Sequence, residues 1–294
     1  MQDLPFVEPG TILFRFLDPG TNHFWQTMAD FLGPQLLFLN SRTRFNDPFD
    51  SKPDIINDVS NADIRTYTRD IFENPWRSER DTFDIARIWS LKAQRKTNLR
   101  GNLLKIIKEG IVAHTDEFLN ECGLTSFSLV GDDPVLWGHY AAGSSGVCVV
   151  FKCGASPMSA FNVCARVSYV EHRPQLPTSL FIRMTKTQRA GLPFGKTANE
   201  IFYLSFLQKS KRWQYEHEAR IFFPFAASTK VRFDKSELGA IILGPKASPE
   251  CERQIRKLVA DLSPSTEVFR ASLSKNGFDV VLPKQFQTFI SAAA

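Results

Sequence analysis

The sequence lacks most of the patterns that identify a protein class at first sight. It contains no GxGxxG or GxxxxGK[ST] phosphate-binding loop, no HExxH helix, no EF-hand loop and no internal repeat. No segment approaches the ~18 consecutive apolar residues that a membrane span needs. Residues 1–6 also lack the basic and apolar parts of a signal peptide. We therefore expect a soluble, cytoplasmic protein that makes no contact with a membrane.

Cysteine is scarce and shows no functional spacing. The five cysteines are odd in number and form neither a CxxC pair nor a Cys/His cluster at zinc spacing. Reduced thiols that behave as small buried apolar groups fit such a sequence in a reducing compartment. We expect no disulfide and no bound metal at these positions, which are Cys122, Cys148, Cys153, Cys164 and Cys251.

Charge of one sign is not in large excess, since 36 Lys and Arg face 31 Asp and Glu. Phe, with 26 copies, greatly outnumbers Tyr and Trp, which favours core packing and shaped pockets because Phe has no polar group. Basic residues gather in residues 87–108, where Leu and Ile recur at helical spacing. This segment is typical of the solvated face of an amphipathic helix, and the alternative is a surface that contacts nucleic acid.

Short strands interspersed with helices predict an α+β fold. Residues 61–122 have helical periodicity, and no Gly/Ser-rich or Pro-rich linker separates them from the rest of the chain. We therefore interpret residues 1–294 as a single domain with a helical insertion at about 61–122. Strands are predicted at 11–17, 35–39, 124–129, 147–151, 164–169, 216–225, 238–243, 268–273 and 279–282, and helices at 133–142, 199–209 and 249–262.

The most informative stretch is residues 209–225, where a charged segment runs into an apolar one. Read with the period of two that a strand imposes, it places Glu216, Glu218 and Arg220 on one face. Like charges two residues apart repel, and ionised groups near a core must be paired or shift their pKa. The pattern therefore indicates either a solvated strand end or a functional site.

Two further constellations carry candidate functional residues. Arg15 lies between two Phe on a predicted strand, so its guanidinium points either to solvent or into a cleft, where it would bind phosphate or carboxylate. Ser126 and Ser128 share one face of another strand. A short helix with three candidate ring-bearing residues follows them, namely Trp137, His139 and Tyr140.

His139 has two interpretations, a histidine satisfied within a core or a general base. A Ser/His/Asp arrangement can be drawn from Ser128, His139 and Asp133, but the G-x-S-x-G elbow that normally presents such a serine is absent.

Several motifs together resemble the bacterial family called domain of unknown function 2971. The resemblance extends over nearly the whole chain, with its motifs in the expected order. They are Phe14-Arg15-Phe16, Arg44-Phe45-Asn46-Asp47-Pro48-Phe49-Asp50, Ser126-Phe127-Ser128, Trp137-Gly138-His139-Tyr140-Ala141, Trp213-Gln-Tyr-Glu216-His-Glu218-Ala-Arg220 and Leu243-Gly244-Pro245.

The order Arg, Ser-x-Ser, Glu-x-Glu also resembles the Arg-Ser-Glu class of mono-ADP-ribosyltransferases, through a much shorter pattern. That resemblance implies a mixed, split sheet around a cleft and an enzyme that takes NAD as substrate, without a metal, and passes ADP-ribose to a protein or nucleic-acid acceptor. Such enzymes serve as bacterial toxins or in phage defence. The sequence departs from the class at Phe127, where the serine motif has Thr, and in the helical insertion.

The same resemblance implies roles for the candidate residues. Glu218 would stabilise the developing ribosyl cation, Glu216 would face the acceptor, and Ser126 would order the site as a catalytic residue. Contacts to NAD would come from Arg15, Ser126, Ser128, Trp137, His139, Tyr140, Asn46 and Tyr215.

Two other functions stay open from the sequence. The first is a non-catalytic module that binds or senses a nucleotide or a nucleic acid, with Arg15 and residues 87–108 as contacts. The second is an intracellular hydrolase that uses His139 and the carboxylates.

Overall fold

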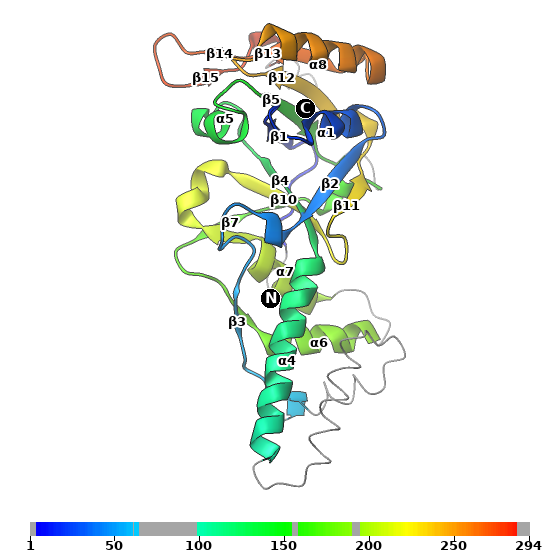
Figure 1. The fold of residues 1–294 in the computed structure, drawn as a ribbon, viewed down its shortest axis with the longest axis vertical. Coiled ribbons are helices and arrows are strands. Elements are labelled where there is room, and N and C mark those ends of the chain that lie inside the picture. The colour runs from blue at the N-terminus through cyan, green and yellow to red at the C-terminus, as the bar shows by residue number, and fades with distance from the viewer. Residues whose placement is uncertain (1–3, 61, 65–98, 155–157, 190–194, 287–294) are drawn as a thin grey trace.

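The computed structural model describes residues 4–60, 62–64, 99–154, 158–189 and 195–286. Helices and short strands surround one large mixed sheet, which confirms the predicted α+β class (Figure 1). No helix within these ranges is both long and apolar enough to cross a membrane.

The large sheet has the strand order β11-β2-β4-β1-β5-β12-β13, and β10 and then β6 continue from the other edge of β4. Neighbouring strands are antiparallel except for the parallel pair β12 and β13. The strands are β1 (Ile12–Leu17), β2 (Leu36–Ser41), β4 (Gly123–Ser128), β5 (Val147–Lys152), β6 (Ala165–Arg166), β10 (Glu218–Phe223), β11 (Thr229–Arg232), β12 (Leu238–Leu243) and β13 (Glu267–Arg270).

The sheet divides at β4. One edge of β4 pairs with β10 along its full length. The other edge is shared, because β2 pairs with its first residues, Gly123 and Leu124, whereas β1 meets it only through Phe14 opposite Ser128. Between these contacts the edge at residues 125–127 has no strand partner among the residues described. This opening is where the candidate site lies.

Both faces of the sheet are covered. Val147, Val149 and Phe151 of β5 belong to a core cluster beneath α1 (Phe24–Leu32) and α8 (Pro249–Leu262), whereas Cys148 and Val150 belong to a second cluster with Trp137 of α5 (Pro134–Tyr140). This alternation follows from the side-chain period of a strand and explains why β5 is apolar throughout.

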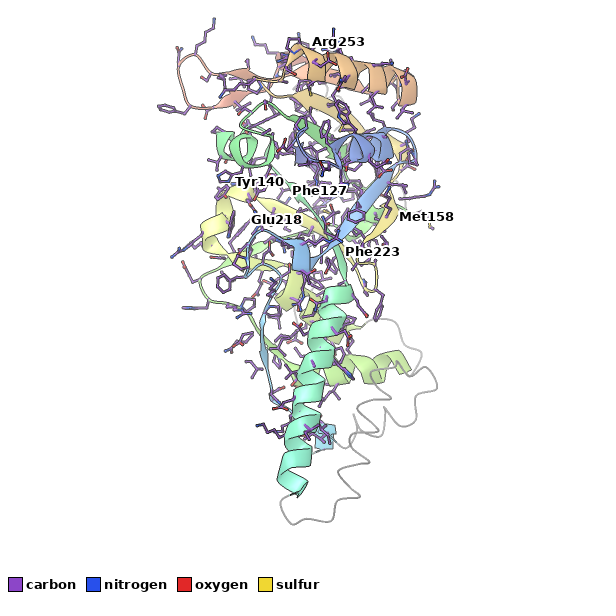
Figure 2. All side chains as sticks on the ribbon, in the orientation of Figure 1. Phe127, Tyr140, Met158, Glu218, Phe223 and Arg253 are labelled. Carbon is purple, nitrogen blue, oxygen red and sulfur yellow. The ribbon has the colours of Figure 1, made fainter. Side chains whose placement is uncertain are left out.

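A third cluster lies toward the other end of the molecule (Figure 1). It joins α4 (Leu99–Glu121), α6 (Thr178–Arg189) and α7 (Lys196–Phe206), where Phe118, Phe181, Phe202 and Phe206 pack closely. The short pairs β3 (Asp54–Ile56) with β8 (Gln175–Pro177), and β7 (Ser168–Val170) with β9 (Gln208–Ser210), complete this part. Figure 2 shows Tyr140 and Glu218 near Phe127, which belongs to the first of the three clusters.

Most predicted elements are present, and α8 has the predicted bounds. The helix expected at 199–209 ends at Phe206, after which the chain enters β9, so Lys209 lies on a strand. The strand expected at 164–169 is broken into β6 and β7, and that at 268–273 into β13 and β14 (Ser272–Leu273), which pairs with β15 (Val280–Val281). Among the described residues, four 3-10 helices, α1, α6, β3, β8, β9 and β11 were not predicted.

The helical insertion is described only in part. The described segments at 62–64 and in α4 are helical, as predicted. Residues 61 and 65–98 lie outside the described residues, and with them most of the basic segment 87–108. Its use as a nucleic-acid contact stays a prediction.

Candidate functional site

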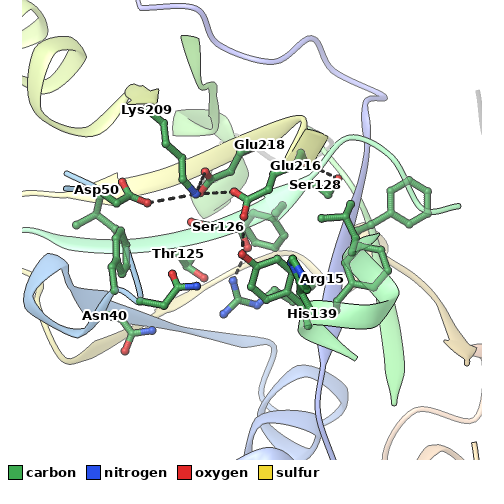
Figure 3. A pocket seen from close by; sticks show the side chains of 18 of the residues that line it. Arg15, Asn40, Asp50, Thr125, Ser126, Ser128, His139, Lys209, Glu216 and Glu218 are labelled. Carbon is green, nitrogen blue, oxygen red and sulfur yellow. Dashed lines mark hydrogen bonds and ion pairs between the residues drawn. The ribbon is translucent and has the colours of Figure 1, made fainter. Parts of the chain in front are cut away.

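A cavity of about 490 Å³ opens where the sheet divides (Figure 3). It lies between β1, β4, the start of β10, α5 and the segment that follows β2. Its polar lining residues are Arg15, Asn40, Arg44, Asn46, Asp50, Thr125, Ser126, Ser128, His139, Tyr140, Lys209, Glu216 and Glu218. The predicted residues Arg15, Ser126 and Glu218 therefore line one pocket.

The Glu-x-Glu segment reaches the pocket by a different backbone path from the predicted strand. Glu216 is the last residue of the 3-10 helix η3 (Lys211–Glu216), His217 has left-handed backbone with φ 45°, and β10 begins at Glu218. The expectation that Glu216 and Glu218 alternate along one strand is therefore wrong. Both side chains are nevertheless buried at the same place.

Lys209 separates the carboxylates that the sequence predicts to repel each other. Its Nζ lies 2.5 Å from Oε2 of Glu216, 3.2 Å from Oε2 of Glu218 and 3.3 Å from Oδ2 of Asp50, and 5.0 Å from the ring centre of Trp213. Burial lowers the pKa of Lys209, but these carboxylates, Glu218 foremost, raise it to a net value above the ordinary one. The ammonium therefore stays protonated and is not a nucleophile.

The carboxylates of Asp50, Glu216 and Glu218 all contact the Lys209 ammonium. Oxygen atoms from separate carboxylates around one point are the ligand set that Mg²⁺ and Ca²⁺ prefer. Within the described residues no group of His, Cys, Asp and Glu is arranged to hold a metal ion.

Arg220 is fully buried and binds two carboxylates at once. Its Nε and Nη2 lie 2.7 and 2.8 Å from the oxygens of Glu218, and its Nη1 and Nη2 lie 2.8 and 2.7 Å from those of Asp50. Nη1 also donates to Ser51 Oγ and to the Phe206 carbonyl. Such fork-shaped pairing satisfies a buried guanidinium that would otherwise be very costly to desolvate.

These contacts keep Glu218 ionised. Burial alone would raise its pKa, but Arg220 first, then Lys209, and hydrogen bonds from Arg220 and Ser126 lower the pKa to about 2. Glu218 is only 5% exposed. The pocket therefore contains a permanent negative charge whose partners are two permanent cations.

The serine motif lies directly beside this network. Ser126 pairs with Arg220 and Ser128 pairs with Glu218 across β4 and β10, so the four side chains share one face of the sheet. Ser128 Oγ donates to the Glu216 carbonyl at 2.8 Å, which holds the end of η3 against β4.

Arg15 enters the pocket through the opening beside β4. Its Nη1 donates to the Ser126 carbonyl, and its guanidinium lies 6.0 Å from the ring centre of Phe127 (Figure 3). Burial of the guanidinium lowers the pKa of Arg15, and the negative charge of Glu218 raises it by a smaller amount. The side chain is partly exposed, in contrast to Arg220.

Helix α5 supplies Tyr140 and His139 but not Trp137. The Tyr140 hydroxyl donates to Oε1 of Glu216, and the exposed His139 has its Nδ1 3.3 Å from the Tyr215 hydroxyl. Trp137 is fully buried and its Nε1 donates to the Gly131 carbonyl at 2.8 Å. Trp137 and Tyr215, two of the residues predicted to contact NAD, are therefore not among the lining residues of the pocket.

Sequence reasoning missed Asp50, Lys209 and Arg44 as site residues. Asp50 ends the Asn-Asp-Pro-Phe-Asp turn and is 4% exposed, although a turn of that composition is normally at the surface. Lys209 precedes Ser210, Lys211 and Arg212 in the sequence, and this local pattern does not distinguish it from a solvated lysine. The signal for Asp50 was available, since the motif was one of those that carried the family resemblance.

These features define an α+β protein whose pocket is built around a buried network of ionised side chains. The family described as "Protein of unknown function (DUF2971)" has a model that matches residues 136–221, which include Lys209, Glu216 and Glu218. The chain is similar to that family over this segment, as the motifs predict. No curated protein and no solved structure matches the chain, and no comparison relates it to ADP-ribosyltransferases.

Proposed function

We propose that the protein binds NAD in this pocket and transfers its ADP-ribose unit to an acceptor. The observation that carries the proposal is the convergence of Arg15, Ser126 and Glu218, from three neighbouring strands, on one cavity. The sequence order of these residues is that of the Arg-Ser-Glu transferases, and the opening beside β4 supports a split-sheet cleft of that kind.

The reaction would break the bond between ribose C1′ and the nicotinamide nitrogen, whose electron pair leaves with nicotinamide. The ribose then carries a developing positive charge that the fixed carboxylate of Glu218 stabilises. Glu216, which lies beside it and binds Lys209 and Tyr140, would accept the proton of the acceptor nucleophile as the new bond to C1′ forms. Ser126 would orient the ribose.

A second candidate is a binding module without catalysis. Glu218 accepts from Arg220 with both oxygens and from Lys209 with one, so much of its charge is already neutralised. That arrangement favours a pocket that holds a nucleotide without stabilising a ribosyl cation.

The arrangement of Ser128, His139 and Asp133 has no comparable support within the described residues. Asp133 caps α5 by accepting from Val135 and Leu136, Ser128 is bound to the Glu216 carbonyl, and His139 contacts Tyr215.

Nicotinamide release from NAD tests the proposal, with cell lysate as a source of acceptor. We expect the wild type to release nicotinamide and Glu218→Gln to be slower by about 10²–10³, with little change in NAD affinity. Glu267→Gln, at an exposed position of β13, is the matched control and keeps full activity. Circular dichroism verifies that each variant is folded.

Thermal melts separate the two candidates. A ligand that binds only the folded state stabilises it by about 2.7 kcal/mol at a hundredfold excess over Kd. A melting temperature that rises with NAD, together with no nicotinamide release under any condition, supports the binding module. Neither release nor a shift with NAD contradicts both.

A further inference from the structure

Two guanidinium groups line the pocket without a carboxylate partner. The only polar contact that Arg15 makes within the described part of the chain is to the Ser126 carbonyl, which carries no net charge. Arg44 is exposed at the pocket wall and has no hydrogen bond or ion pair with any described residue.

The other cations of this region are saturated. Arg220 binds Asp50 and Glu218, Lys209 contacts three carboxylates, and Arg42 binds Asn120 and Asp116. Arg15 and Arg44 therefore differ from the rest in having donors that a ligand can use, and an arginine has five such donors in a fixed fork.

Arg42 holds the backbone of Arg44 in position. It ends the 3-10 helix η1 (Arg42–Arg44), and Arg42, which is 2% exposed, ties that helix to α4 through Asn120 and Asp116 and to the Ser51 carbonyl. Because η1 is held in this way, the backbone that carries Arg44 at the pocket wall is fixed. The Arg-x-Arg spacing thus combines one structural and one unpaired arginine.

The charge of the pocket points to an anion. Lys209 and Arg220 neutralise two of the three negative charges of Asp50, Glu216 and Glu218. Arg15 and Arg44 add two positive charges, so the net charge of these seven side chains is −3 + 4 = +1. The excess positive charge lies on Arg15 and Arg44, the two arginines that have no carboxylate partner among the described residues. A ligand with two linked phosphates offers one phosphate group to each guanidinium, whereas inorganic phosphate offers a single group to both.

We propose that Arg15 and Arg44 together form a pyrophosphate subsite of the pocket, with Arg44 as the residue that selects two linked phosphates over one. This inference rests on the proposed function in that NAD and ADP-ribose contain such a pyrophosphate. Each charge-assisted fork contributes beyond a neutral hydrogen bond because the guanidinium is planar and matches phosphate oxygens in pairs.

Isothermal titration with inorganic pyrophosphate, inorganic phosphate and ADP-ribose tests it. The variants are Arg44→Gln, Arg44→Lys and, as a control, Arg232→Gln at an exposed position of β11 outside the pocket. We expect wild type to bind pyrophosphate more tightly than phosphate. Arg44→Gln should weaken pyrophosphate and ADP-ribose by about 10- to 100-fold, and Arg44→Lys by less, because it keeps the charge and loses the fork.

Arg232→Gln should bind as wild type does. Melting temperatures without ligand should be unchanged in Arg44→Gln, since Arg44 has no partner to lose among the described residues. Equal affinity of wild type and Arg44→Gln for pyrophosphate overturns the inference, and so does equal affinity of wild type for phosphate and pyrophosphate.

Failure of this inference is distinguishable from failure of the proposed function. Pyrophosphate binding that depends on Arg44, in a protein that releases no nicotinamide, supports the subsite and contradicts the transferase. Nicotinamide release with an unchanged KM for NAD in Arg44→Gln supports the transferase and overturns the subsite.

Discussion

At the scale of single residues, the site depends on how five ionised side chains neutralise one another. Glu218 illustrates the balance, since burial and two cations act on it in opposite directions and the cations dominate. The sequence suggested that removing its charge would relieve repulsion from Glu216. In the structure Lys209 lies between the two carboxylates, so removing one leaves a buried cation short of a partner, which destabilises the fold.

Stability should therefore depend on pH through Glu218. Its folded pKa of about 2 is below the usual value for an unfolded glutamate, so its stabilisation is present above about pH 5 and is lost as pH falls toward 2. The full contribution is about 3 kcal/mol, and roughly half of it is lost by pH 3. Urea unfolding of wild type and Glu218→Gln near pH 6 and pH 3 measures this.

The difference in unfolding free energy between the two proteins should shrink at the lower pH. Carboxylates outside this network titrate alike in both proteins and cancel in the difference. A difference that stays constant between the two pH values would show that Glu218 is not held ionised by its partners.

At the scale of secondary-structure elements, short helices position the pocket. Helix α5 has Asp133 as its N-cap, which accepts from Val135 N at 2.7 Å, and Pro134 in its first turn. Its last residues, His139 and Tyr140, line the cavity. Helix α8 is capped in the same way by Ser248, but none of its residues lines the pocket.

Substitutions of the two N-cap residues, Asp133 and Ser248, distinguish an effect on stability from an effect on ligand binding. Asp133→Ala and Ser248→Ala should each cost about 1 kcal/mol of unfolding free energy, because each removes an acceptor for otherwise unpaired helix N–H groups. Only Asp133→Ala should also weaken ADP-ribose binding, since it loosens the helix that holds Tyr140 against Glu216. Urea unfolding and isothermal titration measure the two effects. Equal loss of affinity in both variants would contradict the assignment of α5 to the site.

At the scale of the whole molecule, the three core clusters contain every cysteine. All five are free and buried. Burial raises the pKa of Cys122 to about 12 and those of Cys148 and Cys164 well above the ordinary range. Because the thiolate is the reactive form, these groups should be inert while the fold is intact.

A thiol-reactive chromogenic disulfide measures this. We expect almost no reaction in native protein at pH 8 and five reacting thiols after denaturation without a reductant, at a rate that follows unfolding when denaturant is added. Fewer than five thiols in denaturant would reveal a disulfide and contradict the sequence-based expectation of a reduced protein.

Much of the fold could be predicted from local pattern. Strands such as β1 and β5 and helix α8 follow from apolar periodicity, a capping serine or aspartate and a proline in the first turn. The same reasoning located Arg15, Ser126 and Glu218, because a charged or hydroxyl residue within an apolar strand stands out. It failed at 3-10 turns and at Lys209, which is followed in the sequence by the exposed residues Ser210, Lys211 and Arg212.

The sequence by itself determined the α+β class, the apolar strands and the positions of three polar motifs, because these depend on residues a few places apart. Only the tertiary structure decided how the motifs meet. Arg220 and Asp50 are separated by 170 positions along the chain, yet they form one of the pairs that hold the pocket. A buried ion pair depends on which partner the fold brings within about 3 Å and on the loss of water around both, and neither quantity is encoded in local spacing.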